Sequence, residues 1–134
     1  MKDTYKSVLI IEDDEIDIVI YEMVIKSIGF AENIIIRKTV EGAMNYLKKA
    51  GKGEEEIPEI ILLDLFMPLE SGFEFLTQFE TLPDSIKKNS KIAVITHSSD
   101  ENDEMKSREN KNVSYFIDKP LTMENLNILR KLYN

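Results

Sequence analysis

Cysteine is absent from the 134-residue sequence, and histidine occurs once, as His97. The absence of cysteine excludes disulfides, thiolate catalysis and cysteine-based zinc sites. A single histidine is too few for a histidine-based metal centre and for most catalytic triads. No apolar stretch approaches the roughly 20 residues that a membrane span requires. Any chemistry must therefore use carboxylates, hydroxyls and lysine.

Positive charge is also in deficit, because 17 Lys and Arg residues stand against 25 Asp and Glu residues, a net charge of −8. An acidic surface repels nucleic acid and anionic membranes, so we expect neither as a partner. The first residues do not resemble a secretory signal, and we expect a cytoplasmic protein. Four prolines are spread along the chain without a low-complexity tract. This composition predicts one globular domain over residues 1–134, with no output domain.

Five short apolar runs predict the strands of one sheet. They are Val8–Ile11, Ile34–Ile36, Ile60–Leu63, Ile92–Ile95 and Tyr115–Ile117. Segments with helical spacing of apolar residues lie between most of them and after the last. Strands that alternate with helices form βα units with parallel strands. The pattern therefore predicts an α/β fold, a three-layer α/β/α sandwich around a five-stranded parallel sheet.

Two of the intervening segments have distinctive compositions. The first predicted helix follows Asp14, and its expected core stripe is Ile16, Val19, Ile20, Met23, Val24 and Ile28. The segment Ser98–Asn112 has Met105 as its only large apolar side chain. A helix in that segment would bury little apolar surface, so we expect it to be weakly anchored.

Polar residues follow the predicted strands, and the carboxyl ends of parallel strands share one edge of the sheet. They are Glu12, Asp13 and Asp14 after the first run, Asp64 after the third, Thr96 after the fourth, and Lys119 after the fifth. Clustered carboxylates repel one another unless they are protonated or bind a divalent cation. Oxygen ligands without sulfur or imidazole favour Mg²⁺, which joins carboxylates to a phosphoryl oxygen. Because no GxxxxGK[ST] loop is present to bind a nucleotide, a carboxylate must itself accept the phosphoryl group.

The order and spacing of these residues resemble the receiver domain of response regulators, over essentially the whole chain. The matching motifs are Glu12-Asp13, Asp64-Leu65-Phe66-Met67-Pro68 with Gly72, Thr96, and Lys119-Pro120. The resemblance implies a flavodoxin-like fold with strand order 2-1-3-4-5 and a stand-alone receiver of two-component or phosphorelay signalling. It also implies that Asp64 is the phospho-acceptor.

The same resemblance implies a Mg²⁺ site beside the acceptor. Asp13 and Asp64 would bind the ion directly, Glu12 would bind it through water, and the backbone carbonyl of Phe66 would complete the protein ligands. These assignments come from the family and not from the spacing alone.

The remaining implied roles concern the phosphorylated state. Lys119 would contact the phosphoryl group, Thr96 would move to hydrogen-bond it, and Phe116 would change rotamer as Thr96 moves. The peptide bond between Lys119 and Pro120 is expected to be cis, a form that X-Pro bonds adopt at modest cost. We expect the Ser98–Asn112 segment to become ordered on phosphorylation or partner binding.

The implied function is signalling, and the chain would be no enzyme beyond catalysing its own phosphorylation and dephosphorylation. A histidine kinase or phosphotransfer protein would donate the phosphoryl group, and a downstream protein, not identifiable from the sequence, would read the change. The Ser98–Asn112 segment, which falls on the expected signalling surface, offers little apolar side-chain area. This favours a monomer or a weak dimer.

Three other functions are compatible with parts of this pattern. A pseudo-receiver would keep the fold and bind partners without phosphorylation, but the complete set of polar residues at the strand ends argues against it. A small Mg²⁺-dependent phosphatase would need a second acidic residue two positions after Asp64, where Phe66 stands. A flavin-binding electron-transfer protein would need a hydroxyl- and glycine-rich phosphate loop where the acidic residues 12–15 would repel the cofactor.

Three residues are candidates for tuning the phosphorylated state. Phe66 occupies a position that is commonly polar in the family, and its side chain either packs on the loop surface or shields the acyl phosphate from water. His97 follows Thr96 where relatives usually have a small residue, and we interpret it as a solvent-side residue that narrows partner access. Ser98 comes next and belongs to the same rim.

Overall fold

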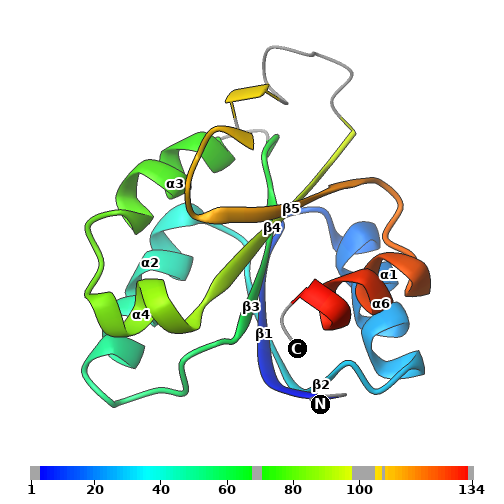
Figure 1. Ribbon diagram of the computed structural model, residues 1–134, viewed down its shortest axis with the longest axis horizontal. Coiled ribbons are helices and arrows are strands. Elements are labelled where there is room, and N and C mark those ends of the chain that lie inside the picture. The colour runs from blue at the N-terminus through cyan, green and yellow to red at the C-terminus, as the bar shows by residue number, and fades with distance from the viewer. Residues whose placement is uncertain (1–3, 68–70, 98–104, 107, 133–134) are drawn as a thin grey trace.

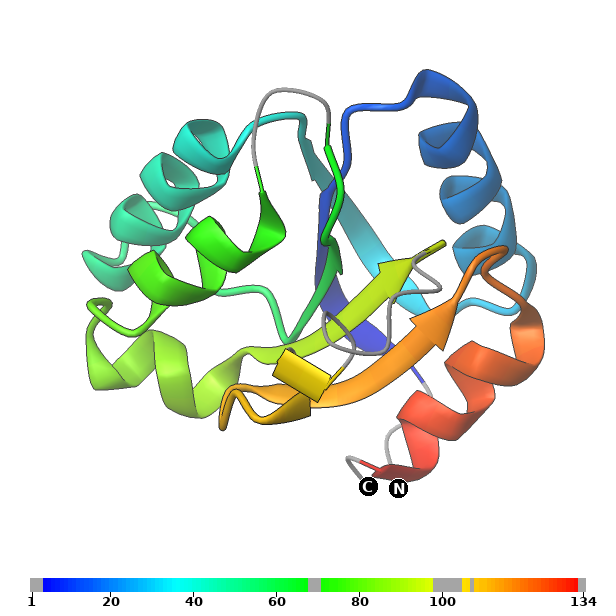
Figure 2. The same cartoon turned by 90° about the horizontal axis from the view of Figure 1, so that it is seen from above.

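The computed structural model describes residues 4–67, 71–97, 105, 106 and 108–132. Within these residues, five parallel strands form one sheet in the order β2-β1-β3-β4-β5. Helices α2, α3 and α4 cover one face, and α1 and α6 cover the other (Figures 1 and 2). The predicted three-layer sandwich and the strand order 2-1-3-4-5 are thereby confirmed.

The predicted strands all lie within strands of the structure. The strands are β1 (Tyr5–Ile11), β2 (Ala31–Arg37), β3 (Ile60–Asp64), β4 (Lys91–Thr96) and β5 (Val113–Asp118). The helices are α1 (Glu15–Ser27), α2 (Val40–Gly51), α3 (Gly72–Phe79), α4 (Asp84–Asn89) and α6 (Met123–Leu132). Helix α4 was not predicted, because its six residues carry a single buried apolar side chain, Ile86, and so show no periodicity.

The middle residues of the central strands are apolar on both faces because helices cover both sides of the sheet. Alternate residues enter two separate cores, one beneath α2, α3 and α4 and one beneath α1 and α6. In β1, Leu9 and Ile11 join the first core while Val8 and Ile10 join the second. The sheet is thus held from both sides, and its carboxyl edge carries the buried charged residues Glu12 and Asp64 together with Thr96.

The predicted core stripe of helix α1 was wrong for three of its residues. Ile16, Val19 and Met23 are 72%, 54% and 65% exposed. The buried residues of α1 are Ile18, Tyr21 and Ile25, with Ile20, Val24 and Ile28 partly buried against the same core. Because almost every side of this helix carries apolar residues, helical spacing fits two stripes equally well. The rotation of the helix against the sheet decides between them.

The segment Ser98–Asn112 lies partly outside the described residues, since residues 98–104 and 107 are among those left out. Residues 105, 106 and 108 are helical and exposed. The predicted ordering of this segment therefore stays a prediction. In the described part of the chain, none of the helices has the length and apolar character needed to cross a membrane.

Candidate functional site

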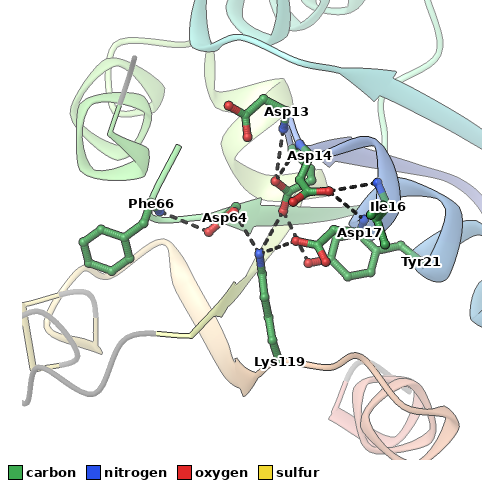
Figure 3. Close-up of polar contacts among 9 residues, drawn as sticks. Asp13, Asp14, Ile16, Asp17, Tyr21, Asp64, Phe66 and Lys119 are labelled. Atoms are coloured by element: carbon green, nitrogen blue, oxygen red, sulfur yellow. Dashed lines mark hydrogen bonds and ion pairs between the residues drawn. The ribbon is translucent and has the colours of Figure 1, made fainter. Parts of the chain in front are cut away.

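The carboxyl ends of four strands bring the predicted polar residues to one edge of the sheet (Figure 3). Glu12 directly follows β1, Asp64 ends β3 and Thr96 ends β4, and all three are almost completely buried. Lys119 follows β5, and its side chain reaches back across this edge. An open cavity of about 430 Å³ lies here, lined by Glu12, Asp13, Asp14, Asp17, Asp64, Phe66, His97 and Lys119.

The ammonium group of Lys119 is the centre of the site. Its Nζ atom lies 2.6 Å from Asp17 Oδ2, 3.1 Å from Asp64 Oδ2 and 3.3 Å from Glu12 Oε2. An ammonium has three N–H donors, so these carboxylates account for all of them. The lysine side chain is only 8% exposed. The positive charge therefore holds together carboxylates from β3, from α1 and from the turn after β1.

The backbone holds Lys119 in place at the end of β5. Its amide donates to the carbonyl of Thr96 at 3.0 Å, and Thr96 is paired with Asp118 across the two strands. The Lys119–Pro120 peptide bond is cis, as the family resemblance implied. Movement at the end of β4 is thus linked directly to the residue that carries the ammonium.

Glu12 is the most deeply buried acid of the cluster. Its Oε1 accepts hydrogen bonds from the backbone amides of Asp13 and Asp14, both at 3.1 Å, and its Oε2 accepts from the Tyr21 hydroxyl at 3.3 Å. Burial raises the pKa of Glu12 to about 8, and the hydrogen bond and charge of Asp64 add to the effect. The pKa of Glu12 therefore depends on the neighbouring Asp64 carboxylate as well as on burial.

The raised pKa of Glu12 predicts a pH-dependent stability. The folded chain binds this proton more tightly than the unfolded chain, whose glutamate has its ordinary pKa of 4.5. The contribution is fully present below pH 4.5 and is lost as the pH rises through about 8. In urea denaturation with a chelator, the free energy of unfolding should therefore fall over this interval. Glu12→Gln should remove that part of the slope, and an unchanged slope in this variant would contradict the assignment.

The two carboxylate oxygens of Asp64 contact different groups. Oδ1 accepts a hydrogen bond from the backbone amide of Phe66 at 3.0 Å, and Oδ2 contacts Lys119. The carboxylate is thus oriented by both the following loop and the lysine, and it borders the open cavity. This arrangement suits a carboxylate that must attack a group arriving from solvent.

Helix α3 begins so close to the acceptor that only glycine fits at its first residue. A Cβ atom on Gly72 would lie 2.7 Å from the carbonyl oxygen of Asp64 and 2.7 Å from Leu65 Cα. Gly72→Ala should therefore lower the free energy of unfolding by about 2 kcal/mol, because the backbone must shift. Gly51→Ala is the matched control, since its nearest contact would be Pro83 Cγ at an ordinary 3.4 Å. Equal urea midpoints for the two variants would contradict this expectation.

The carboxylates that line this edge offer oxygen donors, which suit Mg²⁺. Glu12 and Asp64 lie together, but the Asp13 carboxylate is directed away from Lys119 (Figure 3). Among the residues that the structure describes, no three or more Asp, Glu or His side chains are gathered as a metal site. Lys119 supplies the positive charge that the carboxylates need. The metal-ligand roles of Glu12, Asp13, Asp64 and Phe66 stay predictions.

Phe66 and His97 both line the cavity, as expected for residues at the rim of the site. Phe66 is 47% exposed. Its ring packs edge-on against the ring of Phe73, with 6.4 Å between the two ring centroids. Lys106 Nζ lies 4.8 Å from the centroid of Phe73. The third candidate for tuning, Ser98, lies outside the described residues.

Phe116 is partly buried on β5, away from the residues that line the cavity. The guanidinium carbon of Arg108 lies 4.9 Å from the centroid of its ring. This contact links Phe116, the residue expected to change rotamer, to the helical residues near position 108. The switch role of Phe116 stays a prediction.

Asp17 is the site residue that the sequence reasoning missed. It lies inside α1. A search for polar residues that directly follow predicted strands therefore does not select it. Its acidic side chain in a first helical turn is also explained by the helix dipole alone. The available signal was its position three residues after Asp14, whose side chain caps the helix and accepts from the Asp17 amide at 3.2 Å.

Comparisons with known proteins agree with the geometry. The family model for the response regulator receiver domain matches residues 8–129. The chain is similar to response regulator Rcp1 from Synechocystis sp., with 32% identity over 105 residues, which are 78% of this chain and 70% of Rcp1. A two-component response regulator from Cytophaga hutchinsonii superimposes with a TM-score of 0.87, at 29% identity over 96% of each chain. The Mn²⁺-bound form of Rcp1 superimposes with a TM-score of 0.73, at 29% identity over 92% of this chain and 88% of that one.

Proposed function

Because the chain belongs to the response regulator receiver domain family, we propose that it accepts a phosphoryl group on Asp64 and signals the event to a partner protein. One observation carries the proposal. The buried Asp64 carboxylate borders an open cavity with one oxygen held by the Phe66 amide and the other 3.1 Å from the Lys119 ammonium. A carboxylate held in this way can act as a nucleophile while a cation neutralises the charge that it receives.

The phosphoryl donor would be a phosphohistidine of a histidine kinase or phosphotransfer protein. An Asp64 oxygen attacks phosphorus in line, its new O–P bond forms as the P–N bond to the donor breaks, and an acyl phosphate results. Lys119 turns one of its N–H groups to a phosphoryl oxygen. Asp13, Asp64, the Phe66 carbonyl and, through water, Glu12 would hold Mg²⁺, which when bound neutralises phosphoryl charge. Water later attacks the acyl phosphate and inorganic phosphate leaves.

The signal would start at Thr96 and end at the surface near residue 108. Thr96 ends β4, and its carbonyl accepts from the amide of Lys119. A Thr96 hydroxyl that moves to the phosphoryl group frees space for Phe116, whose ring contacts Arg108. A protein partner would read this change. In this proposal the chain turns over no other substrate.

Incubation with acetyl phosphate and Mg²⁺, followed by intact mass measurement, tests the proposal. We expect a single adduct of one phosphoryl group that requires Mg²⁺. Beryllofluoride with Mg²⁺ should shift the amide resonances of Thr96 and Phe116. A chain that forms no adduct and gives no response to Mg²⁺ would instead be a pseudo-receiver.

Phe66 should lengthen the life of the acyl phosphate by covering it. Its ring lines the cavity and is steadied by Phe73, so it can keep water from the phosphorus atom. Phe66→Asn should speed loss of the phosphoryl group by about tenfold, because water attack is then less hindered. The measurement is a time course of intact mass after acetyl phosphate is removed.

A matched variant separates bulk from aromatic character at this position. Phe66→Leu keeps an apolar side chain over the cavity, and its rate of phosphoryl loss should stay close to that of the native chain. If Phe66→Asn loses the phosphoryl group no faster than the native chain, the side chain only packs on the loop surface.

A further inference from the structure

Asp17 makes the shortest of the three contacts with the Lys119 ammonium, at 2.6 Å. The other two carboxylates have further roles. Glu12 also accepts from two backbone amides and from Tyr21, and Asp64 also accepts from the Phe66 amide. Asp17 belongs to neither the acceptor nor the proposed metal ligands. Its carboxylate can therefore stay with the lysine when the other two carboxylates are occupied.

The position of Asp17 is set before any ligand binds. The cap formed by Asp14 holds the first turn of α1 and accepts from the Asp17 amide. The Asp17 side chain is 21% exposed, so it borders the cavity instead of lying in the core. A short contact from a rigid first turn keeps the lysine at the edge of the sheet with little loss of entropy.

Charge explains why such an anchor is needed. A divalent cation held by Asp64 directly and by Glu12 through water would repel the ammonium and compete for two of its partners at the same time. Burial by itself lowers the pKa of Lys119, and the hydrogen bond that Lys119 donates to Asp17 is the strongest of the interactions that raise this pKa. Without Asp17, the lysine would face the cation with no remaining negative partner among its three present contacts.

We propose that Asp17 is a positioning residue, which keeps the Lys119 ammonium beside Asp64 when a divalent cation takes up Glu12 and Asp64. This role rests on the proposed phospho-acceptor function and deepens it. Asp17 touches neither the phosphoryl group nor the metal in this scheme and acts through Lys119. Its removal should leave the acceptor and the metal ligands in place but leave the lysine free to move out of the site.

The ¹⁵Nζ resonance of Lys119 reports this position without any phosphoryl donor. In the full chain with saturating Mg²⁺, an ammonium held by hydrogen bonds exchanges slowly and gives an observable signal, which Lys119→Arg assigns by its loss. Asp17→Asn should abolish the signal and slow phosphorylation by acetyl phosphate about tenfold, since a misplaced catalytic group is costly. Asp17→Ser removes the same carboxylate and should behave alike, so the result does not depend on how one variant folds.

Glu15→Gln is the matched control. Glu15 lies in the same first turn and carries the same charge, but it pairs with Lys38. This variant should keep both the resonance and the native rate. If Asp17→Asn and Asp17→Ser match Glu15→Gln in both readouts, Asp17 only favours the helix dipole and the proposal is overturned. A native chain that takes no phosphoryl group would refute the proposed function instead, because the resonance is read without phosphorylation.

Discussion

Asp64→Asn is expected to abolish phosphorylation by acetyl phosphate, with a rate at least about a thousandfold below that of the native chain. The amide has no anionic oxygen to attack phosphorus, and the nearest other carboxylates are committed to Lys119 and to backbone amides. Intact mass after incubation with acetyl phosphate and Mg²⁺ measures the effect. The side chains are nearly equal in size, so the variant should remain folded.

Asp118→Asn is the matched control for the acceptor. Asp118 ends strand β5 of the same sheet but is exposed, and its carboxylate does not line the cavity. This variant should form the adduct at close to the native rate. An adduct that persists in Asp64→Asn would move the acceptor to another carboxylate and refute the central assignment.

Lys119→Met is expected to slow phosphorylation by about a hundredfold and to destabilise the metal-free chain by about 3 kcal/mol at pH 8. The loss of the ammonium leaves the carboxylates of Glu12, Asp17 and Asp64 without their shared cation. Two of these side chains are no more than 3% exposed, so water would replace the lysine only in part. Urea denaturation with a chelator measures the stability.

Mg²⁺ should recover part of this stability, because it returns positive charge to the same oxygens. Lys38→Met is the control, since Lys38 and Glu15 form an exposed surface pair whose loss should cost less than about 1 kcal/mol. A deficit of Lys119→Met that is equal with and without Mg²⁺ would show that the lysine acts through packing alone.

The strands could be predicted because their signal is local. Buried parallel strands must be apolar on both faces, and runs such as Ile60–Leu63 are too short and too uniform for a surface helix. The polar residue that follows each run is then placed by topology, because parallel strands end at one edge. The approach of Glu12, Asp64 and Lys119 could therefore be anticipated, and the structure brings these three side chains within hydrogen-bonding distance.

The buried face of helix α1 could not be predicted from the local sequence pattern. Ile16 and Val19 fit the predicted stripe as well as Ile18 and Tyr21 fit the observed one. The choice depends on how the capped turn at Asp14 meets the sheet, and on the Tyr21 hydroxyl reaching Glu12. The spacing of apolar residues along the helix predicts neither of these contacts. The same rotation brings Asp17 to the cavity and exposes Ile16.

The sequence by itself determined the layered α/β fold and the set of carboxylates, one hydroxyl and one ammonium that meet at the carboxyl edge of its sheet. These follow from the alternation of apolar runs and from residues that are neighbours along the chain. Only the tertiary structure decided the partners of Lys119, the raised pKa of Glu12, the direction of Asp13 and the contact of Asp17 with the lysine. Each of these depends on distances of a few ångströms between residues far apart in the sequence, and electrostatic energies in a buried site change steeply over such distances.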